Sequence, residues 1–425
     1  MKIEPVARLD GHIAVPGDKS ISHRALLIGA LCDGDVRVRQ WGRSGDTEST
    51  LAAVRALGVE VDEEDVDTLV VHGVGLRGLR APEAPIDCGN AGTLARLITG
   101  ILTFQDGRFE LVGDQSLSGR PLWIAEPLGR MGASIETVDG RLPFVIEGRP
   151  LKGIEYEPPV KSAQVKSAII LAGLGARGRT TVVELAATRD HTELMLEAAG
   201  AKVRRSAKSV SVEGAKGLHL DEVLVPGDIS SAAPFLVAAA LSPGSSLTVH
   251  DVGINPRRAG LLDVLERMGV RVGVLNKRRI AGELVGDVEV TGTHELVPAW
   301  VGADEVPRLV DELPLVALLG AFAHGQTRVS GAEELRAKES DRIETVTAAL
   351  HAIGVRIEPL DDGFVVRGTP ARPRGGTIDA AGDHRIAMLG AVAGVVSREG
   401  VRLEGAESVS ISFPGFFDLL ASVSQ

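Results

Sequence analysis

One pattern occurs five times along this chain: an apolar, helix-like segment ends at a glycine, and a short segment alternating in Val or Ile follows. The glycines, which lie 68 to 85 residues apart, are Gly58, Gly132, Gly200, Gly269 and Gly354. Glycine suits the left-handed residue that closes a helix, and the alternation suits a half-buried strand. The repeat is longer than a typical solenoid unit and indicates duplicated subdomains. With a sixth helix expected at residues 414–422, the sequence predicts six similar α/β units in two groups of three.

Length and composition fit a two-domain globular protein. The 425 residues exceed one ordinary domain, and hydrophobic residues, at 44%, supply enough material for packed cores. A net charge of -11 argues against nucleic acid or an anionic membrane as the main partner. Cys32 and Cys88 give neither a disulfide framework nor a metal-binding spacing, and no apolar run suits a signal peptide or a membrane span. We therefore expect a cytoplasmic protein, and a monomer, because no exposed apolar helix face requires a second copy.

Two nucleotide-binding motifs are excluded. The stretch GVGLRG at residues 73–78 matches G-x-G-x-x-G, but Pro82 and Pro85 forbid the helix that must follow. The stretch GDKS at residues 17–20 lacks the spacing of a Walker A loop, and no H-E-x-x-H zinc motif occurs. A nicotinamide dehydrogenase and a metalloprotease are therefore not expected.

Small-residue turns precede helices at four places in the first half of the chain, and each carries a polar or cationic group. These groups are Lys19, Ser20 and Arg24; Asn90, Gly92 and Arg96; Arg120, before a proline that could start a helix; and Ser162 with Gln164. Helix N-termini offer free amides and a positive dipole end, so such turns bind phosphates or carboxylates. One turn alone would fit an ordinary capped helix with a solvated cation. Four together favour an anionic ligand.

The second half carries carboxylates as well as cations. Asp311 and a neighbouring Glu begin a very apolar helix, and Lys338 and Arg342 are expected on one helix face because they lie four residues apart. That segment alone would equally fit a salt-bridged surface helix. Arg385 stands at the start of an apolar helix, where a cation opposes the dipole, and this placement indicates a ligand.

The motifs GDKSISHR, DCGNAGT, LSGRP, SAQVKSA, RDHTE, DELP, RAKESDR and GDHRIAM, in this order, resemble those of the 5-enolpyruvylshikimate-3-phosphate synthase family. The set is specific and extends over essentially the whole chain. The resemblance implies an α/β fold of two similar domains, each of three βαβαββ units, which is the inside-out α/β barrel of the enolpyruvyl transferases. It implies one domain at residues 17–225 and a second made of residues 1–16 and 226–425.

The resemblance also implies a reaction. The enolpyruvyl group of phosphoenolpyruvate moves to the 5-hydroxyl of shikimate 3-phosphate and phosphate is released, a step of chorismate and aromatic amino acid biosynthesis that needs no metal or other cofactor. By similarity, the residues that meet shikimate 3-phosphate are Lys19, Ser20, Arg24, Ser162, Ala163, Gln164, Arg189, Asp311 and Lys338. Those that meet phosphoenolpyruvate are Lys19, Gly92, Arg120, Gln164, Arg342 and Arg385. Asp311 is the candidate base for the hydroxyl proton, and Glu339 and Lys19 are alternative candidates for the acid.

Departures and rivals follow from the same motifs. Many members have Lys where this chain has Ile411, so one contact to the departing phosphate is lost or supplied elsewhere. Gly92 resembles glyphosate-sensitive members, whereas SAQVK and RDHTE resemble the less sensitive branch, and sensitivity stays open. The nearest rival, the transferase acting on UDP-N-acetylglucosamine, usually carries a Cys that residues 113–121 lack. A non-catalytic anion-binding or RNA-end-processing protein is the rival of another class, and the acidic charge with Asp311 and Glu339 speaks against it.

Overall fold

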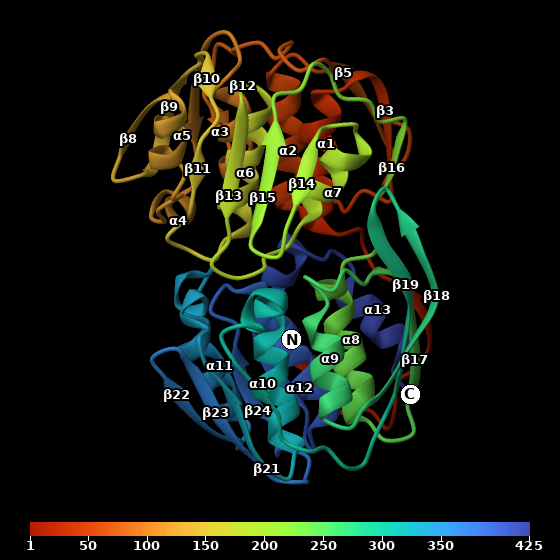
Figure 1. The fold of residues 1–425 in the computed structure, drawn as a ribbon. Helices are drawn as coiled ribbons and strands as arrows, with labels where there is room; N and C mark the ends of the chain where they lie inside the picture. Colours follow the sequence, from red (N-terminus) through yellow and green to blue (C-terminus); the bar gives the residue numbers. More distant parts are fainter. The chain divides into compact units, whose positions relative to one another are not determined.

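Figure 1 shows the computed structural model, which describes residues 1–425. Contacts divide the chain into two compact units of similar internal density. Unit 1 comprises Met1–Pro16, Pro226–Arg278 and Leu284–Gln425, and unit 2 comprises Gly17–Val225 and Arg279–Glu283. The short segment Arg279–Glu283 spans the turn of the hairpin formed by β18 (Arg271–Ile280) and β19 (Glu283–Thr291). No helix is long and apolar enough to cross a membrane.

Three four-stranded sheets of one design form unit 2. In each, the first edge strand runs parallel to its neighbour and the other pairs are antiparallel. Their orders are β16-β3-β5-β4 (Glu222–Leu224, Asp33–Arg39, Leu69–Val74, Val61–Glu63), β6-β7-β9-β8 (Ile86–Asp87, Arg108–Val112, Arg141–Glu147, Ser134–Val138) and β11-β13-β15-β14 (Glu155–Tyr156, Arg179–Val183, Ser209–Glu213, Val203–Arg205). A further short parallel pair joins β10 (Leu151–Lys152) and β12 (Ala176–Arg177).

Unit 1 repeats this design with one difference. Its sheets have the orders β18-β19-β17-β2, with β17 (Ser246–Gly253) and β2 (Asp10–Ala14); β20-β21-β23-β22 (Trp300–Val301, Gly325–Val329, Gly363–Gly368, Arg356–Leu360); and β1-β25-β24 (Lys2–Ile3, Val401–Glu404, Gly376–Asp379). The third sheet has only three strands, and β1, from the start of the chain, pairs antiparallel with β25. Likewise β2 runs parallel to β17. Unit 1 is therefore completed by the first residues of the chain.

Three apolar helices occupy the interior of each unit (Figure 1). In unit 2 they are α1 (Lys19–Ala30), α3 (Gly92–Leu102) and α6 (Ala163–Leu174); in unit 1 they are α8 (Ile229–Leu241), α10 (Leu313–Phe322) and α12 (His384–Val396). Nearly all of their residues are buried, including the polar residues Ser22, His23 and Arg24 of α1. Small residues allow close packing: a Cβ on Gly100 would lie 2.2 Å from the backbone oxygen of Ala168, so α3 and α6 can meet only because Gly100 has no side chain.

Five further helices precede the glycines of the repeat. They are α2 (Gly45–Ala56), α5 (Ala125–Met131), α7 (His191–Ala198), α9 (Gly260–Arg267) and α11 (Arg342–Ala352). The glycine after each has a positive φ, between 86° and 106°, and a strand begins two or three residues later. The predicted helix–glycine–strand repeat is confirmed at all five positions. The sixth helix, α13 (Phe416–Val423), lies close to its predicted range and no hairpin follows it.

Candidate active site

The three interior helices of unit 2 bring their N-termini together. The side-chain amide of Gln164, on α6, donates to Thr93 Oγ1 on α3 at 2.8 Å. The guanidinium of Arg24, on α1, donates to Ser167 Oγ on α6 at 3.0 Å. The small-residue turns that the sequence singled out therefore meet at one end of this unit. Three positive dipole ends in one place favour an anion.

At the start of α1, a cation and a carboxylate pair. Asp18 caps the helix by accepting from the Ile21 amide at 2.9 Å. Lys19 is the first helical residue, and its Nζ lies 2.8 Å from Asp46 Oδ2 on α2. Both side chains of this pair are partly exposed. Asp46 stabilises a lysine that the helix dipole alone would disfavour.

Arg24 is buried, yet its charge is not neutralised by a directly bonded carboxylate. It donates to Thr192 Oγ1 at 2.7 Å, to the Ser20 carbonyl at 2.8 Å and to Ser167, all of them neutral acceptors. Burial lowers the pKa of its guanidinium to about 10, and nearby Arg189 acts in the same direction. The group is still protonated at neutral pH. A buried cation held by hydroxyls is therefore available for an anionic ligand.

The glycine turn before α3 is held by Arg96. This side chain donates to the carbonyls of Gly92, at 3.1 Å, and Leu122, at 3.1 Å, and to Gln164 Oε1 at 2.8 Å. A Cβ on Gly92 would lie 3.0 Å from the Arg96 guanidinium. Arg96 therefore shapes this turn and fixes the orientation of the Gln164 amide.

The expectation that the proline after Arg120 starts a helix is wrong. Arg120 follows the short helix α4 (Gln115–Ser118), where it donates to the Ser116 carbonyl at 3.2 Å and bonds the side chain of Asn90. Trp123 has a positive φ of 61°, a conformation that interrupts a helix, and α5 begins only at Ala125. Arg120 thus stands on a loop.

The start of α6 matches the sequence prediction. Ser162 caps the helix by accepting from the Val165 amide at 3.4 Å, and Ala163 is its first residue. The first amides of an α-helix have no intrahelical acceptor, so this helix start offers donors to a ligand.

In unit 1 the interior helices also meet at their N-termini. The Ser230 hydroxyl, in the first turn of α8, donates to Glu312, which immediately precedes α10. Arg385, in the first turn of α12, donates to the Ser230 carbonyl at 3.0 Å. Asp383 caps α12 by accepting from the Arg385 amide at 2.8 Å. Asp228 caps α8 in the same way, by accepting from the Ser230 amide at 2.8 Å.

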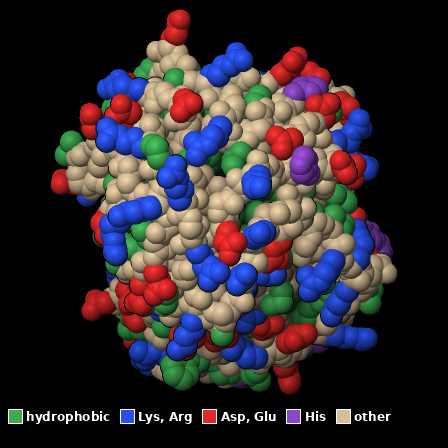
Figure 2. Space-filling view, turned by 45° about the horizontal axis from the view of Figure 1, so that its top comes forward, with side chains coloured by type: hydrophobic (Ala, Val, Ile, Leu, Met, Phe, Trp, Pro, Cys, Tyr) green, Lys and Arg blue, Asp and Glu red, His purple; other side chains and the backbone are tan.

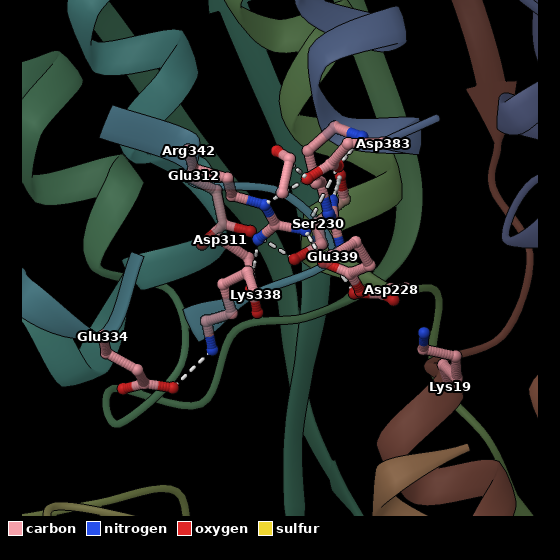
Figure 3. A network of polar contacts seen from close by, with 12 residues as sticks. Lys19, Asp228, Ser230, Asp311, Glu312, Glu334, Lys338, Glu339, Arg342 and Asp383 are labelled. Atoms are coloured by element: carbon pink, nitrogen blue, oxygen red, sulfur yellow. Dashed lines mark hydrogen bonds and ion pairs between the residues drawn. The ribbon is translucent and has the colours of Figure 1, made fainter. Parts of the chain in front are cut away.

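Arg342 is enclosed by carboxylates, as Figure 3 shows. Its side chain is 1% exposed; Nε lies 2.9 Å from Asp383 Oδ2, Nη1 lies 3.2 Å from Asp311 Oδ1, and Nη2 bonds Glu339. Burial acts to lower the pKa of this guanidinium, but the three carboxylates outweigh it and raise that pKa above its ordinary value. The two predicted carboxylates, Asp311 and Glu339, are thus brought together on one arginine.

The expectation that Lys338 shares a helix face with Arg342 is wrong. Lys338 ends the 3-10 helix η3 (Glu333–Ala337) and pairs with Glu334, away from the Arg342 cluster (Figure 3). Asp341 accepts from the Ile343 amide at 3.1 Å and starts a new helix, α11, at Arg342. A capping aspartate between the two residues breaks the periodicity on which the expectation relied.

Sequence reasoning missed Arg258. This buried guanidinium bonds Ser230, lies 3.1 Å from Glu312 Oε2 and 3.6 Å from Asp228 Oδ1, and approaches Asp311 Oδ2 at 3.9 Å. An internal repeat contains the signal that would have located its partners. The sequence PGDIS at residues 226–230 repeats PGDKS at residues 16–20, and both begin an interior helix with a capping Asp.

Surface charge is dispersed on the face seen in Figure 2. Lys and Arg side chains alternate there with Asp and Glu, and hydrophobic side chains form only small separate patches. The side chain of Ile411 is half exposed at the end of the 3-10 helix η4 (Ala406–Ile411).

Two units that each surround three interior helices with three sheets define an enolpyruvyl transferase fold, and solved structures agree. EPSP synthase from Acinetobacter baumannii superposes with a TM-score of 0.91 at 40% identity, covering 100% of this chain and 97% of that one. The enolpyruvyl transferase NikO from Streptomyces tendae superposes with a TM-score of 0.78 at 21% identity, covering 99% and 96%, which shows a shared fold. The predicted fold class is confirmed.

The family follows from the sequence comparisons. The model of EPSP synthase (3-phosphoshikimate 1-carboxyvinyltransferase) matches residues 3–420. Proteins named 3-phosphoshikimate 1-carboxyvinyltransferase from Acidithiobacillus ferrooxidans and Geobacillus kaustophilus are each 46% identical, over 415 and 422 residues; the matches cover 97% and 98% of this chain and 95% and 98% of those proteins. The chain belongs to the EPSP synthase family and is a transferase.

Proposed function

We propose that this chain transfers the enolpyruvyl group of phosphoenolpyruvate to the 5-hydroxyl of shikimate 3-phosphate and releases phosphate, in the pathway to chorismate and the aromatic amino acids. Family membership supports the reaction. The observation that carries the proposal is the clustering of interior helix N-termini with cations in each unit. Each substrate carries a phosphate of about -1.5 to -2 charge and also a carboxylate, so binding needs several cations and free amides.

For shikimate 3-phosphate, we infer that unit 2 supplies most of the contacts. The proposed residues are Lys19, Ser20, Arg24, Ser162, Ala163, Gln164 and Arg189. Three observations support them: the converging helix starts, the charge on Arg24, which its directly bonded acceptors do not neutralise, and the effect of Arg189 on the pKa of Arg24. The contributions of Asp311 and Lys338 to the same substrate stay predictions from the resemblance.

For phosphoenolpyruvate, the proposed residues are Lys19, Gly92, Arg120, Gln164, Arg342 and Arg385. The Gly92 turn has a defined conformation, because its carbonyl accepts from Arg96 at 3.1 Å and its amide donates to the Asn90 carbonyl at 2.9 Å. Arg385 uses one guanidinium nitrogen on the Ser230 carbonyl, an uncharged acceptor, and so retains its charge for an anion.

Asp311 is the proposed base. Arg342 donates to one carboxylate oxygen at 3.2 Å, and Arg258 lies 3.9 Å from the other, so the carboxylate is held in a defined orientation. In the proposed reaction Asp311 takes the proton of the 5-hydroxyl while an acid adds a proton to the methylene carbon of the enol. The hydroxyl oxygen then bonds the cationic carbon and gives a tetrahedral intermediate. Phosphate leaves when its bond to this carbon breaks, and the methyl group returns a proton to the conjugate base of the acid, so that the carbon–carbon double bond of the new enol ether forms. Glu339 and Lys19 remain alternative acids.

We further propose that the two units are the two domains of the transferase, at residues 17–225 and at residues 1–16 with 226–425. The division of contacts supports these bounds, except that the hairpin turn Arg279–Glu283 groups with unit 2. The monomeric state and the cytoplasmic location stay predictions from the sequence.

Phosphate release by the purified full-length chain tests the proposal. We expect release from phosphoenolpyruvate when shikimate 3-phosphate is the acceptor, and none above background with UDP-N-acetylglucosamine. Release with the sugar nucleotide alone would assign the chain to the rival transferase. Release with neither acceptor would remove the proposed activity.

A further inference from the structure

Behind Arg24, two pairs of neighbouring residues connect α6 with α7. Ser167 and Thr192, which both accept from Arg24, also bond each other at 2.7 Å. The residues next to them form an ion pair: Lys166 Nζ lies 2.7 Å from Glu193 Oε1. The motif SAQVKSA on α6 and the motif RDHTE at α7 are therefore physical partners.

Lys166 also fixes the turn that leads to Arg189. Its Nζ lies 2.9 Å from Glu184 Oε1 and 3.5 Å from the Thr188 carbonyl. The same oxygen of Glu184 accepts from the Thr188 amide at 3.0 Å and from the Thr188 hydroxyl at 2.7 Å. The Lys166 ammonium group therefore bonds Glu184, Glu193 and the Thr188 carbonyl, and Thr188 directly precedes Arg189.

The cluster is buried and contains charges of both signs. Lys166 and Glu193 are each 1% exposed, and the side chain of Glu184 is 6% exposed. Burial acts to raise the pKa of Glu184, but Lys166 and Thr188 outweigh it and hold that pKa below its ordinary value. Glu193 has a second buried oxygen without a hydrogen bond, and its charge acts to raise the pKa of Arg24. Lys166 bonds both carboxylates directly, whereas Arg24 acts on Glu193 only at longer range and bonds neutral groups alone.

We propose that Lys166 is a positioning residue for the binding of shikimate 3-phosphate. It clamps α7 and the Glu184–Thr188 turn onto α6, so that Thr192 holds the Arg24 guanidinium in a fixed direction and Arg189 is presented beside it. Lys166 itself is not a proposed ligand contact, because its ammonium group is engaged by Glu184, Glu193 and the Thr188 carbonyl. The inference rests on the proposed function, because that function makes Arg24 and Arg189 substrate contacts.

The decisive comparison uses Lys166→Met and the double variant Lys166→Met/Glu193→Gln. The single variant leaves two buried carboxylates facing one cation, so it lowers both stability and the order of the turn. The double variant restores charge balance without restoring the clamp. We expect the KM for shikimate 3-phosphate to rise about tenfold or more in both variants, with the KM for phosphoenolpyruvate within about twofold of the parent, while the double variant regains most of the lost stability.

If Lys166 only stabilises the fold, we expect a different result. In that case the KM for shikimate 3-phosphate would return to the parental value as stability returns in the double variant, and this outcome overturns the proposal. An unchanged KM in a folded Lys166→Met variant overturns it as well.

If Lys166→Met does not fold, Glu193→Gln alone replaces it, since this change keeps the Lys166–Glu184 pair. A parental KM for shikimate 3-phosphate in Glu193→Gln would again overturn the proposal. Lys152→Met, at an exposed lysine of β10, is the matched control and should change neither constant.

Hydrogen exchange separates this inference from the proposed function. The Thr188 amide is bonded to Glu184, so its exchange should accelerate about tenfold in Lys166→Met and stay at the parental rate in Lys152→Met. This readout needs no substrate. If phosphate release fails but exchange at the Thr188 amide accelerates in Lys166→Met, the proposed function is rejected and the clamp by Lys166 is supported. If exchange at the Thr188 amide is unchanged in Lys166→Met, the clamp is rejected.

Discussion

Arg342 Nε lies 2.9 Å from Asp383 Oδ2, and both side chains are buried, at 1% and 0% exposure. The pair joins the first residue of α11 to the N-cap of α12. Arg342 also bonds Asp311 and Glu339. Asp383 therefore fixes the position of the Arg342 guanidinium, and through it the positions of both predicted carboxylates.

Removing the charge of Asp383 should therefore destabilise unit 1. Asp383→Asn can keep the cap on the Arg385 amide but leaves Arg342 short of one carboxylate. We expect a loss of about 3–5 kcal/mol, the usual effect of breaking a buried pair. Urea unfolding measures it, with exposed Asp361→Asn as the control. A midpoint within error of that control would contradict the assigned role.

Asp311→Asn should lower turnover strongly and spare binding. The amide keeps the shape of the side chain but cannot accept the 5-hydroxyl proton. We expect kcat to fall by about 10²–10⁴, the range for loss of a general base. Phosphate release gives kcat, and calorimetry with shikimate 3-phosphate checks that the acceptor still binds. Normal turnover would remove Asp311 from the base role.

Arg385→Met should weaken the donor more than the acceptor. The variant loses a cation at the start of α12 but not the cap made by Asp383. A hydrogen bond to a charged group contributes about 1.5–3 kcal/mol, which corresponds to roughly 10–100-fold in the KM for phosphoenolpyruvate. Initial rates at saturating shikimate 3-phosphate give this constant. An unaltered donor KM counts against a contact at Arg385.

His23 should make the protein acid-sensitive. It is buried on α1, its Nδ1 lies 2.6 Å from Thr50 Oγ1, and burial lowers the pKa of its imidazole to about 3. The unfolded chain takes up this proton near pH 6.5 and the folded chain only near pH 3. The contribution of neutral His23 to the free energy of unfolding is therefore fully present above pH 6.5 and is lost as the pH falls from 6.5 towards 3. The slope is about 1.4 kcal/mol per pH unit.

His23→Gln removes this titration while an amide can still bond Thr50. The stability difference between parent and variant should therefore shift in favour of the variant as the pH falls from 6.5 to 4.5. Urea unfolding at four pH values measures this trend. Parallel pH profiles for the two proteins would show that His23 does not contribute.

Local patterns predicted much of this fold. The glycines at helix ends, such as Gly58 and Gly354, were found because a left-handed residue is a local requirement. The helix starts at Lys19 and Gly92 were predicted because a small-residue turn before a helix is also a local pattern. Lys338 was misplaced because capping by Asp341 overrides a four-residue spacing.

Other parts of the site depend on tertiary structure. Arg258 is 4% exposed and its acidic partners lie 30 to 54 residues away, so no local pattern marks it. The pairing of Lys166 with Glu193 also joins two helices that are separate in the sequence. Lysine is rarely buried in proteins, so the residue type alone predicts that Lys166 is exposed.

The place of β1 and β2 in unit 1 fixes an order of events during translation. Residues 17–225 leave the ribosome as one uninterrupted segment, but β1 pairs with Val401–Glu404, so it waits while nearly the whole chain is made. At about 5–20 residues per second this wait is roughly 20–80 s. During that time the first strand is an unpaired edge on a nascent chain. Its two-residue length, the charge of Lys2 within it and the charge of Glu4 directly after it protect it from pairing with another polypeptide.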